Sequence, residues 1–423
     1  MAENSSKKMG FNATWSMAVG GMVGGGIFAV LGVIVEIAGS LAWLSFLIGG
    51  LIALATAASY AHLARKFGEG GGAFTFLRAE HHKATAGSLS WVLIVGYVLT
   101  LSVYAFTFGH YLDAVVGLGP TFARAAAIAI VAILAGVNLL GVGEASWLEI
   151  VTVWGKLAVL LGLALYGLIQ FSPENVRYAE ADPGGLGGAL LGAAVVFMAY
   201  EGFQLLTYDY EDIRDADRVL PRASLWAVVA VIAVYISVSL GAASLVGAAK
   251  LIEHREIALA EAGKQALGSA GLILVSVAAA FSTASAVNAT LFATARLARS
   301  VAADAELPDF LAVTDRHGIP ARAVLTLAAG SIALAVFGDL GRLVEAASLT
   351  FLVTFASVNV LSARNSETDL LRITSWAGAI GSILAAATLT VRLATEAPEI
   401  LAVLVILMLV AVVGRPLILG HRD

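Results

Sequence analysis

Two ionisable side chains stand in segments that are otherwise apolar. Lys156 lies in the run Val-Thr-Val-Trp-Gly-Lys-Leu-Ala-Val-Leu, and Glu201 lies in Phe-Met-Ala-Tyr-Glu-Gly-Phe-Gln. An ionisable group inside a membrane segment is costly, and such groups usually face interior partners and serve function. A buried lysine exchanges its proton readily when its surroundings change, so Lys156 is a candidate proton carrier. The alternative is a lysine whose stem reaches back to the nearer membrane surface.

The second chemical feature is the glycine-rich stretch from Ala18 to Phe28. Gly24, Gly25 and Gly26 follow one another, although each lowers helix propensity by about 0.8–1 kcal/mol relative to alanine. Non-helical backbone at membrane depth is tolerated where it is buried in protein or lines a wet cavity. The stretch therefore predicts a broken helix whose open ends hold a ligand. Close helix packing through Gly-x-x-x-Gly spacing is the alternative.

A second interruption is predicted at Glu201 and Gly202, within the sixth apolar segment. Breaks in spans one and six are five spans apart, so the second unit enters the membrane from the opposite face. This arrangement is typical of an inverted repeat with its binding site near the midplane. Three roles remain open for Glu201: a hydrogen bond that holds the break, a second proton site, or a counter-charge for a cationic substrate.

The composition sets the class of protein that must position these groups. Of 423 residues, 59% are hydrophobic and 13% are charged, whereas soluble domains carry about 25% charged residues. This predicts an all-α integral membrane protein. The absence of cysteine excludes disulfides and thiol chemistry. The scattered histidines predict no metal site, no basic tract indicates nucleic acid, and the polar start of the chain is not that of a cleaved signal peptide.

Twelve membrane spans are predicted from the apolar runs. They cover residues 11–38, 40–64, 85–117, 121–141, 146–170, 186–208, 221–247, 267–300, 320–338, 340–362, 372–392 and 397–416. Placing the N-terminus inside leaves most lysines and arginines in cytoplasmic loops, as the positive-inside rule requires. Both termini are therefore expected in the cytoplasm. The predicted units are a tail at 1–10, a first repeat at 11–170, a second repeat at 186–362, two final spans at 372–416 and a short tail at 417–423.

Three stretches together resemble the amino acid–polyamine–organocation (APC) superfamily of transporters. They are Val23 to Phe28, Phe197 to Phe203 with the following Glu211-Asp212-Ile213 and Pro221-Arg222-Ala223, and Phe281 to Thr290 with Arg296 and Leu307-Pro308. The resemblance implies a LeuT-type fold with a five-plus-five inverted repeat and broken helices 1 and 6. Two departures are Asp215-Ala216, where the family usually has Asn-Pro, and Gly25, where many members have a small hydroxyl residue.

The chemistry of broken helices suits an amino acid head group. Amides at a half-helix N-terminus suit the carboxylate, and free carbonyls at a half-helix C-terminus suit the ammonium. We expect the amides of Gly24, Gly25 and Gly26 to hold the carboxylate. The other candidates for substrate binding are Ala18, Val19, Met22, Phe197, Met198, Tyr200, Glu201 and Phe203. Tyr104, Phe108 and Ser348 are weaker candidates, and ordinary packing is the alternative for each aromatic residue.

The position of Lys156 resembles that of the lysine in ApcT-like proton-coupled members of the superfamily. That resemblance implies an ammonium in the place of a coupling sodium, between spans one and eight. Its expected partners are the backbone near Gly20 and Gly21 and the hydroxyls of Ser282, Thr283 and Ser285. At the cytoplasmic end, Arg296 and Arg299 are expected to meet Asp209, Glu211 and Asp212.

These observations predict a secondary active transporter, not an enzyme, that carries amino acids across the plasma membrane in symport with protons. No cofactor is expected beyond the proton, and the expected partners are an amino acid and the lipid bilayer, without sodium or nucleic acid. A sodium-independent amino acid/amine exchanger and a transporter of polyamines or cationic amino acids are the alternatives. A membrane-embedded enzyme would need a nucleophile with a base at common depth, and a sensor usually needs a soluble output domain; neither pattern is present.

Overall fold

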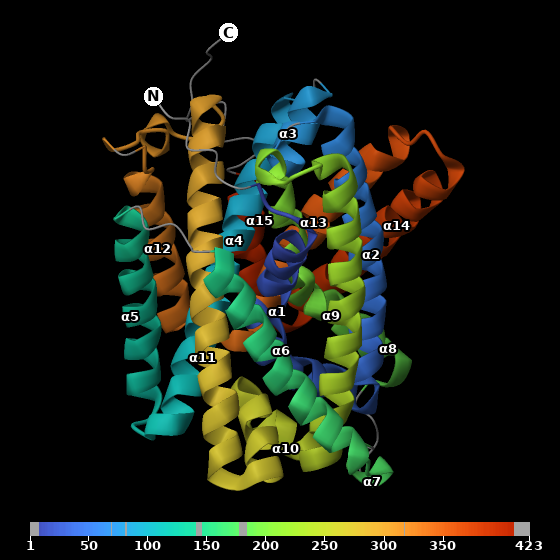
Figure 1. Ribbon diagram of the computed structural model, residues 1–423, viewed down its shortest axis with the longest axis vertical. Coiled ribbons are helices and arrows are strands. Elements are labelled where there is room, and N and C mark those ends of the chain that lie inside the picture. The colour runs from blue at the N-terminus through green and yellow to red at the C-terminus, as the bar shows by residue number, and fades with distance from the viewer. Residues whose placement is uncertain are drawn as a thin grey trace.

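The computed structural model describes residues 8–68, 70–80, 83–140, 146–176, 184–316 and 318–409. Within these ranges the chain is built from helices and the turns between them (Figure 1). The extended pairing described there is one isolated bridge between Met9 and Ile213. The prediction of an all-α membrane protein is confirmed.

A helix lies at each of the predicted spans. The helices at the other spans are α1 (Phe11–Ala38), α2 (Ala42–Phe67), α4 (Lys83–Val116), α5 (Pro120–Leu139), α6 (Ser146–Ile169), α9 (Ala216–Val246), α11 (Ala258–Ala303), α12 (Ala321–Phe337), α13 (Leu340–Arg364), α14 (Asp369–Glu396) and α15 (Pro398–Leu409). The sixth span is composite: α8 (Gly185–Val195) continues into the 3-10 segments η2 (Val196–Tyr200) and η3 (Phe203–Thr207). Short connecting helices are η1 (Gly39–Leu41), α3 (Gly72–Ala79), α7 (Pro173–Val176), η4 (Tyr210–Asp212), α10 (Ala248–Glu253), η5 (Arg255–Ile257) and η6 (Asp309–Leu311).

Nine helical stretches among the described residues are long and apolar enough to cross a membrane. In that count α1 and α2 form one stretch, while α12 and α15 are shorter apolar helices. The number of twelve crossings and the boundaries of the two repeats therefore stay predictions. The predicted tail at 417–423, the last part of the twelfth span and residues 1–7 lie outside the described residues.

Helix α1 is the centre of the molecule (Figure 1). It contacts α6, α8, α9 and α11, and every residue from Met22 to Val35 is buried. The outer helices instead expose large apolar side chains, such as Ile133 on α5, Leu165 on α6 and Ile383 on α14. Apolar surface of this kind suits lipid, so the buried middle of α1 is where a polar site can be kept from the membrane.

The first glycine stretch differs from its prediction. Helix α1 is continuous from Phe11 to Ala38, so the expected break in span one is not observed in this conformation. Neighbouring elements pack directly against the glycine backbone, where a side chain would collide with them. The glycines thus behave in this state as the packing alternative predicts.

Candidate functional site

The sixth span breaks where the sequence predicts. Helix α8 ends at Val195, η2 ends at Tyr200, and Glu201 then takes an extended conformation with φ −63° and ψ 138°. Gly202 follows with φ 137°, a value that side-chain-bearing residues rarely adopt. Two adjacent non-helical residues therefore interrupt the span within a fully buried stretch.

The break in span six lies directly against the backbone of α1. A Cβ atom placed on Gly202 would lie 2.6 Å from the carbonyl carbon of Gly21 and from the amide nitrogen of Met22. A Cβ atom on Gly21 would in turn lie 3.0 Å from Cα of Gly202. The two glycine-containing elements therefore touch backbone to backbone, at the depth where the sequence places the binding site.

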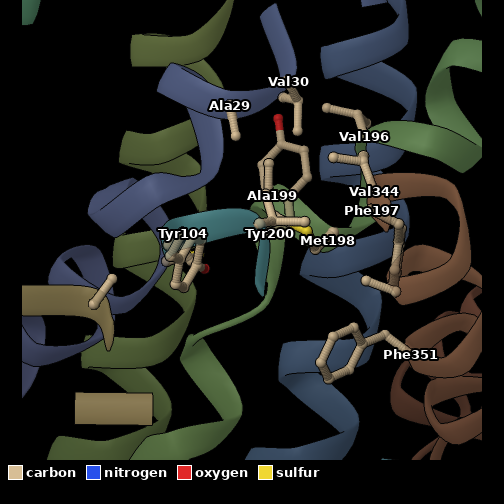
Figure 2. Close-up of a cluster of buried hydrophobic side chains, with 14 of the residues drawn as sticks. Ala29, Val30, Tyr104, Val196, Phe197, Met198, Ala199, Tyr200, Val344 and Phe351 are labelled. Atoms are coloured by element: carbon tan, nitrogen blue, oxygen red, sulfur yellow. The ribbon is translucent and has the colours of Figure 1, made fainter. Parts of the chain in front are cut away.

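The three consecutive glycines of α1 each face a different neighbour. A Cβ atom on Gly24 would lie 2.7 Å from Cβ of Ala286 on α11, and one on Gly26 would lie 2.9 Å from Cα of Ala199. On Gly25 it would overlap the ring of Tyr104, which α4 supplies. Figure 2 shows Tyr104 and the residues of η2 gathered beside α1. The predicted carboxylate site is therefore covered by an aromatic ring in this conformation.

Side-chain donors from other helices reach carbonyl groups of α1. Tyr235 on α9 donates to the carbonyl of Met22 at 2.7 Å, with its hydroxyl also 2.9 Å from the carbonyl of Ala199. Ser282 on α11 donates to the carbonyl of Val23 at 3.0 Å. Carbonyls of α1 therefore accept hydrogen bonds from side chains beside the helix, and an ammonium group would bind to them in the same way.

Lys156 points from α6 to the same part of α1. Its side chain is 4% exposed, and Nζ donates to the carbonyl of Gly20 at 3.0 Å. This contact is the one predicted near Gly20 and Gly21, and it places the ammonium group inside the protein. The Lys156 side chain is thus enclosed by protein and is not exposed to lipid or solvent.

Of the predicted hydroxyl partners of Lys156, one bonds to α1 and the other two do not among the described contacts. Ser282 donates to the carbonyl of Val23 on α1, three residues after Gly20. Thr283 instead donates to the carbonyl of Ala279 within α11 at 2.8 Å. Ser285 is half-buried, and no hydrogen bond from it to Lys156 is present among the described contacts.

Glu201 is buried, and its side-chain neighbours are polar but uncharged. Nε2 of Gln204 donates to its carboxylate at 3.0 Å and lies 3.3 Å from the hydroxyl of Tyr97. The side-chain oxygen of Gln204 also accepts from the amide of Gly202 at 2.9 Å. The hydroxyl of Tyr104 faces the carboxylate without a well-aligned hydrogen bond. Gln204 thus holds the turn and the carboxylate together, which supports the structural role considered for Glu201.

The remaining candidates are buried with different neighbours, except Phe108 on α4, which is half-buried. The amide of Met198 donates to the hydroxyl of Ser348 at 3.0 Å, and Ser348 donates to the carbonyl of Val195 at 2.6 Å. Tyr200 donates to the carbonyl of Phe46 on α2 at 2.6 Å, so its hydroxyl points away from Glu201. The aromatic rings of Phe197 and Phe203 both pack on Phe355. Ala18 and Val19 lie inside α1, at 0% and 1% exposure.

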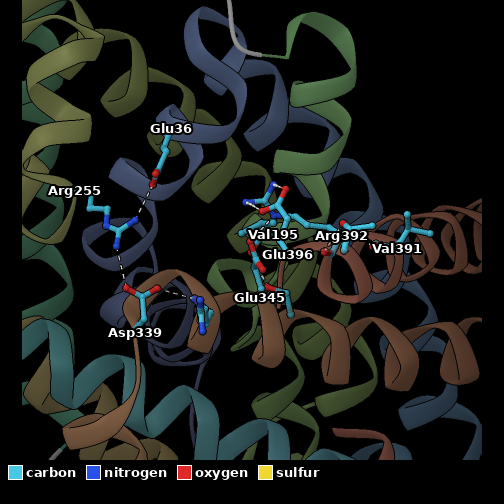
Figure 3. A network of polar contacts seen from close by, with 11 residues as sticks. Glu36, Val195, Arg255, Asp339, Glu345, Val391, Arg392 and Glu396 are labelled. Atoms are coloured by element: carbon cyan, nitrogen blue, oxygen red, sulfur yellow. Dashed lines mark hydrogen bonds and ion pairs between the residues drawn. The ribbon is translucent and has the colours of Figure 1, made fainter. Parts of the chain in front are cut away.

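One end of the site is closed by an ion network that the sequence did not indicate. Arg255 of η5 donates to Glu36 at the end of α1 at 3.0 Å and to Asp339 at the start of α13 at 2.9 Å (Figure 3). The backbone of Arg255 also lies directly over Gly32 of α1. A short loop helix is therefore fixed across the end of α1.

The opposite end is closed by chain segments around the start of α1. The amide of Met9 donates to the carbonyl of Asp212 at 2.8 Å, and the amide of Arg214 donates to the carbonyl of Met9 at 2.9 Å. Arg296 lies 3.5 Å from Asp209, which confirms one of the ion pairs predicted there. Burial raises the pKa of the Asp209 carboxyl above its ordinary value, while the guanidinium of Arg296 opposes that shift. Both ends of the site are thus closed in this state.

Comparison with known families identifies this architecture. A family model described as amino acid permease matches residues 9–413. The chain belongs to the amino acid permease family. Membership implies the LeuT-type fold that the motifs predict, in a multi-pass membrane transporter.

Several curated relatives of this permease are similar over most of their length. The uncharacterized protein MJ0609 of Methanocaldococcus jannaschii is 35% identical over 73% of this chain and 71% of its own. The inner membrane transport protein YbaT of Escherichia coli is 29% identical over 85% and 84%. The serine/threonine exchanger SteT of Bacillus subtilis is 24% identical over 71% and 69%.

Some residues of the permease site escaped prediction from sequence. The role of Gln204 could have been predicted, because it is a polar residue three positions after Glu201 in a buried segment. The role of Tyr235 could not have been predicted, since a single tyrosine in an apolar span is commonly a packing residue. Arg255, Glu36 and Asp339 come from three segments that are distant in the sequence, and only the folded chain brings them together.

Proposed function

We propose that this permease takes up amino acids in symport with protons and that Lys156 is the coupling residue. The observation that carries the proposal is the contact of the buried Lys156 ammonium with the carbonyl of Gly20. That contact joins α6 to the helix on which the substrate site is proposed. Losing the proton removes the charge that this carbonyl attracts, so protonation can favour one arrangement of α1 over another.

The substrate head group is proposed to bind between α1 and the break in span six. The amides of Gly24 to Gly26 are the proposed carboxylate site, and the carbonyls of α1 and η2 are the proposed ammonium site. In the closed state these groups are enclosed, with the ring of Tyr104 over Gly25. Substrate entry therefore requires Tyr104 to move and α1 to open locally. Glycine at these positions lets a ligand approach the backbone closely.

Uptake into proteoliposomes tests the coupling residue. Labelled neutral amino acids are supplied under an inward proton gradient without sodium, to wild type, Lys156→Ala and Lys156→Arg. A gradient of one pH unit is worth about 1.4 kcal/mol, so one proton per substrate supports about tenfold accumulation. Arginine keeps its proton under these conditions, so the Lys156→Arg variant retains a cation without a titrating group.

The expected result is accumulation by wild type and none by either variant. Lys264→Met is the matched control, because that lysine is half exposed on α11 and pairs with Glu261 at the surface. Accumulation that persists in Lys156→Arg would exclude proton exchange at this residue. Failure of wild type to accumulate substrate, together with exchange after preloading, would overturn symport.

Exchange is the second candidate function. It is favoured by the similarity to SteT, whose name describes a serine/threonine exchanger. In that case Lys156 is a fixed positive charge at the place of a coupling cation, and uptake requires substrate on the other side. A transporter of polyamines or cationic amino acids, with Glu201 as counter-charge, is the third, and inhibition of uptake by polyamines or by lysine distinguishes it. In each case the plasma membrane, with both termini in the cytoplasm, is the proposed location.

A further inference from the structure

A cavity of about 560 Å³ lies where α9 begins, beside the first residue of α1. It is separate from the buried site, and α9 starts at the end of the molecule where Figure 1 draws α3. Its lining residues are Phe11, Asp215, Arg218, Val219, Arg222 and Trp226. The cavity therefore combines cationic and aromatic side chains from two helices, and neither the transport site nor the closing contacts use it.

The cationic part of the cavity is available to an anion. Arg218 and Arg222 are four residues apart, so they lie on one face of α9. The side chain of Arg218 is 77% exposed and lies 4.0 Å from Asp215. Arg222 is exposed and makes no ion pair among the described residues. Asp215 offsets one arginine, which leaves one positive charge in excess, and guanidinium groups match phosphate geometry with paired hydrogen bonds.

The aromatic part of the cavity faces outward. Trp226 follows Arg222 by about one helical turn, or about 6 Å along α9, and is 62% exposed. Phe11 at the start of α1 is 45% exposed. Tryptophan is typical of the boundary between lipid and water, where its ring meets both. A ligand that fills the cavity must therefore carry an anionic group at one end and apolar groups at the other.

We propose that this cavity binds the headgroup of an anionic phospholipid. Arg218 and Arg222 hold the phosphate, and Trp226 and Phe11 lie against the glycerol and the first part of an acyl chain. A phosphodiester with one negative charge matches the single excess positive charge. In the proposed orientation the cavity faces the cytoplasmic leaflet, where anionic lipids give a negative surface potential. Each arginine is expected to raise the preference for anionic over neutral lipid about fivefold, equivalent to about 1 kcal/mol.

Quenching of Trp226 fluorescence by brominated lipids tests this site. The protein is reconstituted in phosphatidylcholine vesicles that contain a minor fraction of either brominated phosphatidylglycerol or brominated phosphatidylcholine. The signal of Trp226 is the difference between wild type and Trp226→Phe, because the chain has seven tryptophans. The test variant is Arg218→Gln/Arg222→Gln, and the control is Arg322→Gln, an exposed arginine in the first turn of α12.

The expected result is stronger quenching of Trp226 by brominated phosphatidylglycerol than by brominated phosphatidylcholine. The double variant equalises the two lipids and keeps the quenching by brominated phosphatidylcholine, which shows that Trp226 still lies in the membrane. Arg322→Gln keeps the wild-type preference. Equal quenching of wild type by both lipids, or a preference that survives the double substitution, would overturn the proposal. Relief of the extra quenching by added inorganic phosphate would support the proposal, because a soluble anion can displace the lipid only where the arginines already hold the lipid phosphate.

Discussion

The glycine stretch of α1 and the break in span six contain the same kind of residue and use it differently. Gly24, Gly25 and Gly26 keep helical geometry, and their missing side chains make room for Ala286, Tyr104 and Ala199. Gly202 has φ 137° and needs glycine for its backbone conformation as well as for space. Glycine in an apolar span therefore indicates close approach of a neighbour in both cases, and a break in only one of them.

The difference has a local cause in the neighbouring polar side chains. The side-chain oxygen of Gln204 accepts a hydrogen bond from the amide of Gly202, and this bond replaces the helical hydrogen bond that the amide lacks at the break. The glycines of α1 are flanked by apolar residues that offer no such bond. The carbonyls of Gly20, Met22 and Val23 are instead bonded from Lys156, Tyr235 and Ser282. The proposed substrate site requires α1 to open locally, as span six already does, so the two regions are expected to become more alike when substrate binds.

The substitution Gly202→Ala is expected to have the largest effect. The Cβ of the alanine would collide with the backbone of Gly21, which cannot rotate away. The φ of this position is also strained for alanine. Each of the two effects should destabilise the protein by about 1–3 kcal/mol. We expect a large fall in thermal stability and loss of uptake, measured by fluorescence-detected unfolding and proteoliposome assay. Gly136→Ala on α5 is the control, because a Cβ there meets no atom within 4 Å. Wild-type stability of Gly202→Ala would contradict the contact with α1.

The substitution Gly25→Ala is expected to be less destabilising, at about 1–3 kcal/mol, because its Cβ meets a side-chain ring instead of backbone. With Tyr104→Ala in the double variant, the loss should be smaller than the sum of the two single losses, since the overlapping ring is then absent. Unfolding measurements on the four proteins of this cycle give the coupling between the two positions. Additive losses would show that Tyr104 does not lie over Gly25.

The substitution Arg255→Gln should loosen the closure over the end of α1. Exposed ion pairs contribute about 0.2–1 kcal/mol each, so stability changes little while opening becomes easier. The natural chain has no cysteine, so Ala29→Cys introduces a single thiol behind this closure. Labelling by a membrane-impermeant reagent should be a few times faster in Arg255→Gln, and Arg124→Gln, at another exposed position, should leave the rate unchanged. Equal rates in all three would show that the network does not limit access.

The smallest expected effect concerns Asp209 and Arg296. Burial raises the pKa of the Asp209 carboxyl, so this ion pair is present above that pKa and is lost as pH falls through it. We expect acidification on that side of the membrane to speed opening of this end, measured with a single introduced cysteine at Thr207. Asp209→Asn should give the fast rate at every pH. A pH effect of the same size in Asp209→Asn would assign it to another group.

Much of the molecule is predictable from residue type and periodicity. Long apolar runs place the spans, and a carboxylate next to glycine marks the break at Glu201 and Gly202, because both are costly in a continuous apolar helix. Whether α1 is continuous or broken is not predictable in this way, since contacts from other spans decide between the two conformations. The covering of Gly25 by Tyr104, and the network of Arg255, depend on tertiary packing that leaves no pattern in the sequence.

The most direct test of proton coupling follows the proton itself. Purified protein is reconstituted with a pH-sensitive dye trapped inside the vesicles, without sodium and without an imposed gradient, and an amino acid that wild type transports is added outside. Wild type should acidify the lumen in step with uptake, whereas Lys156→Arg should not acidify it. Uptake by wild type without acidification, or acidification that persists in Lys156→Arg, would contradict proton coupling through Lys156.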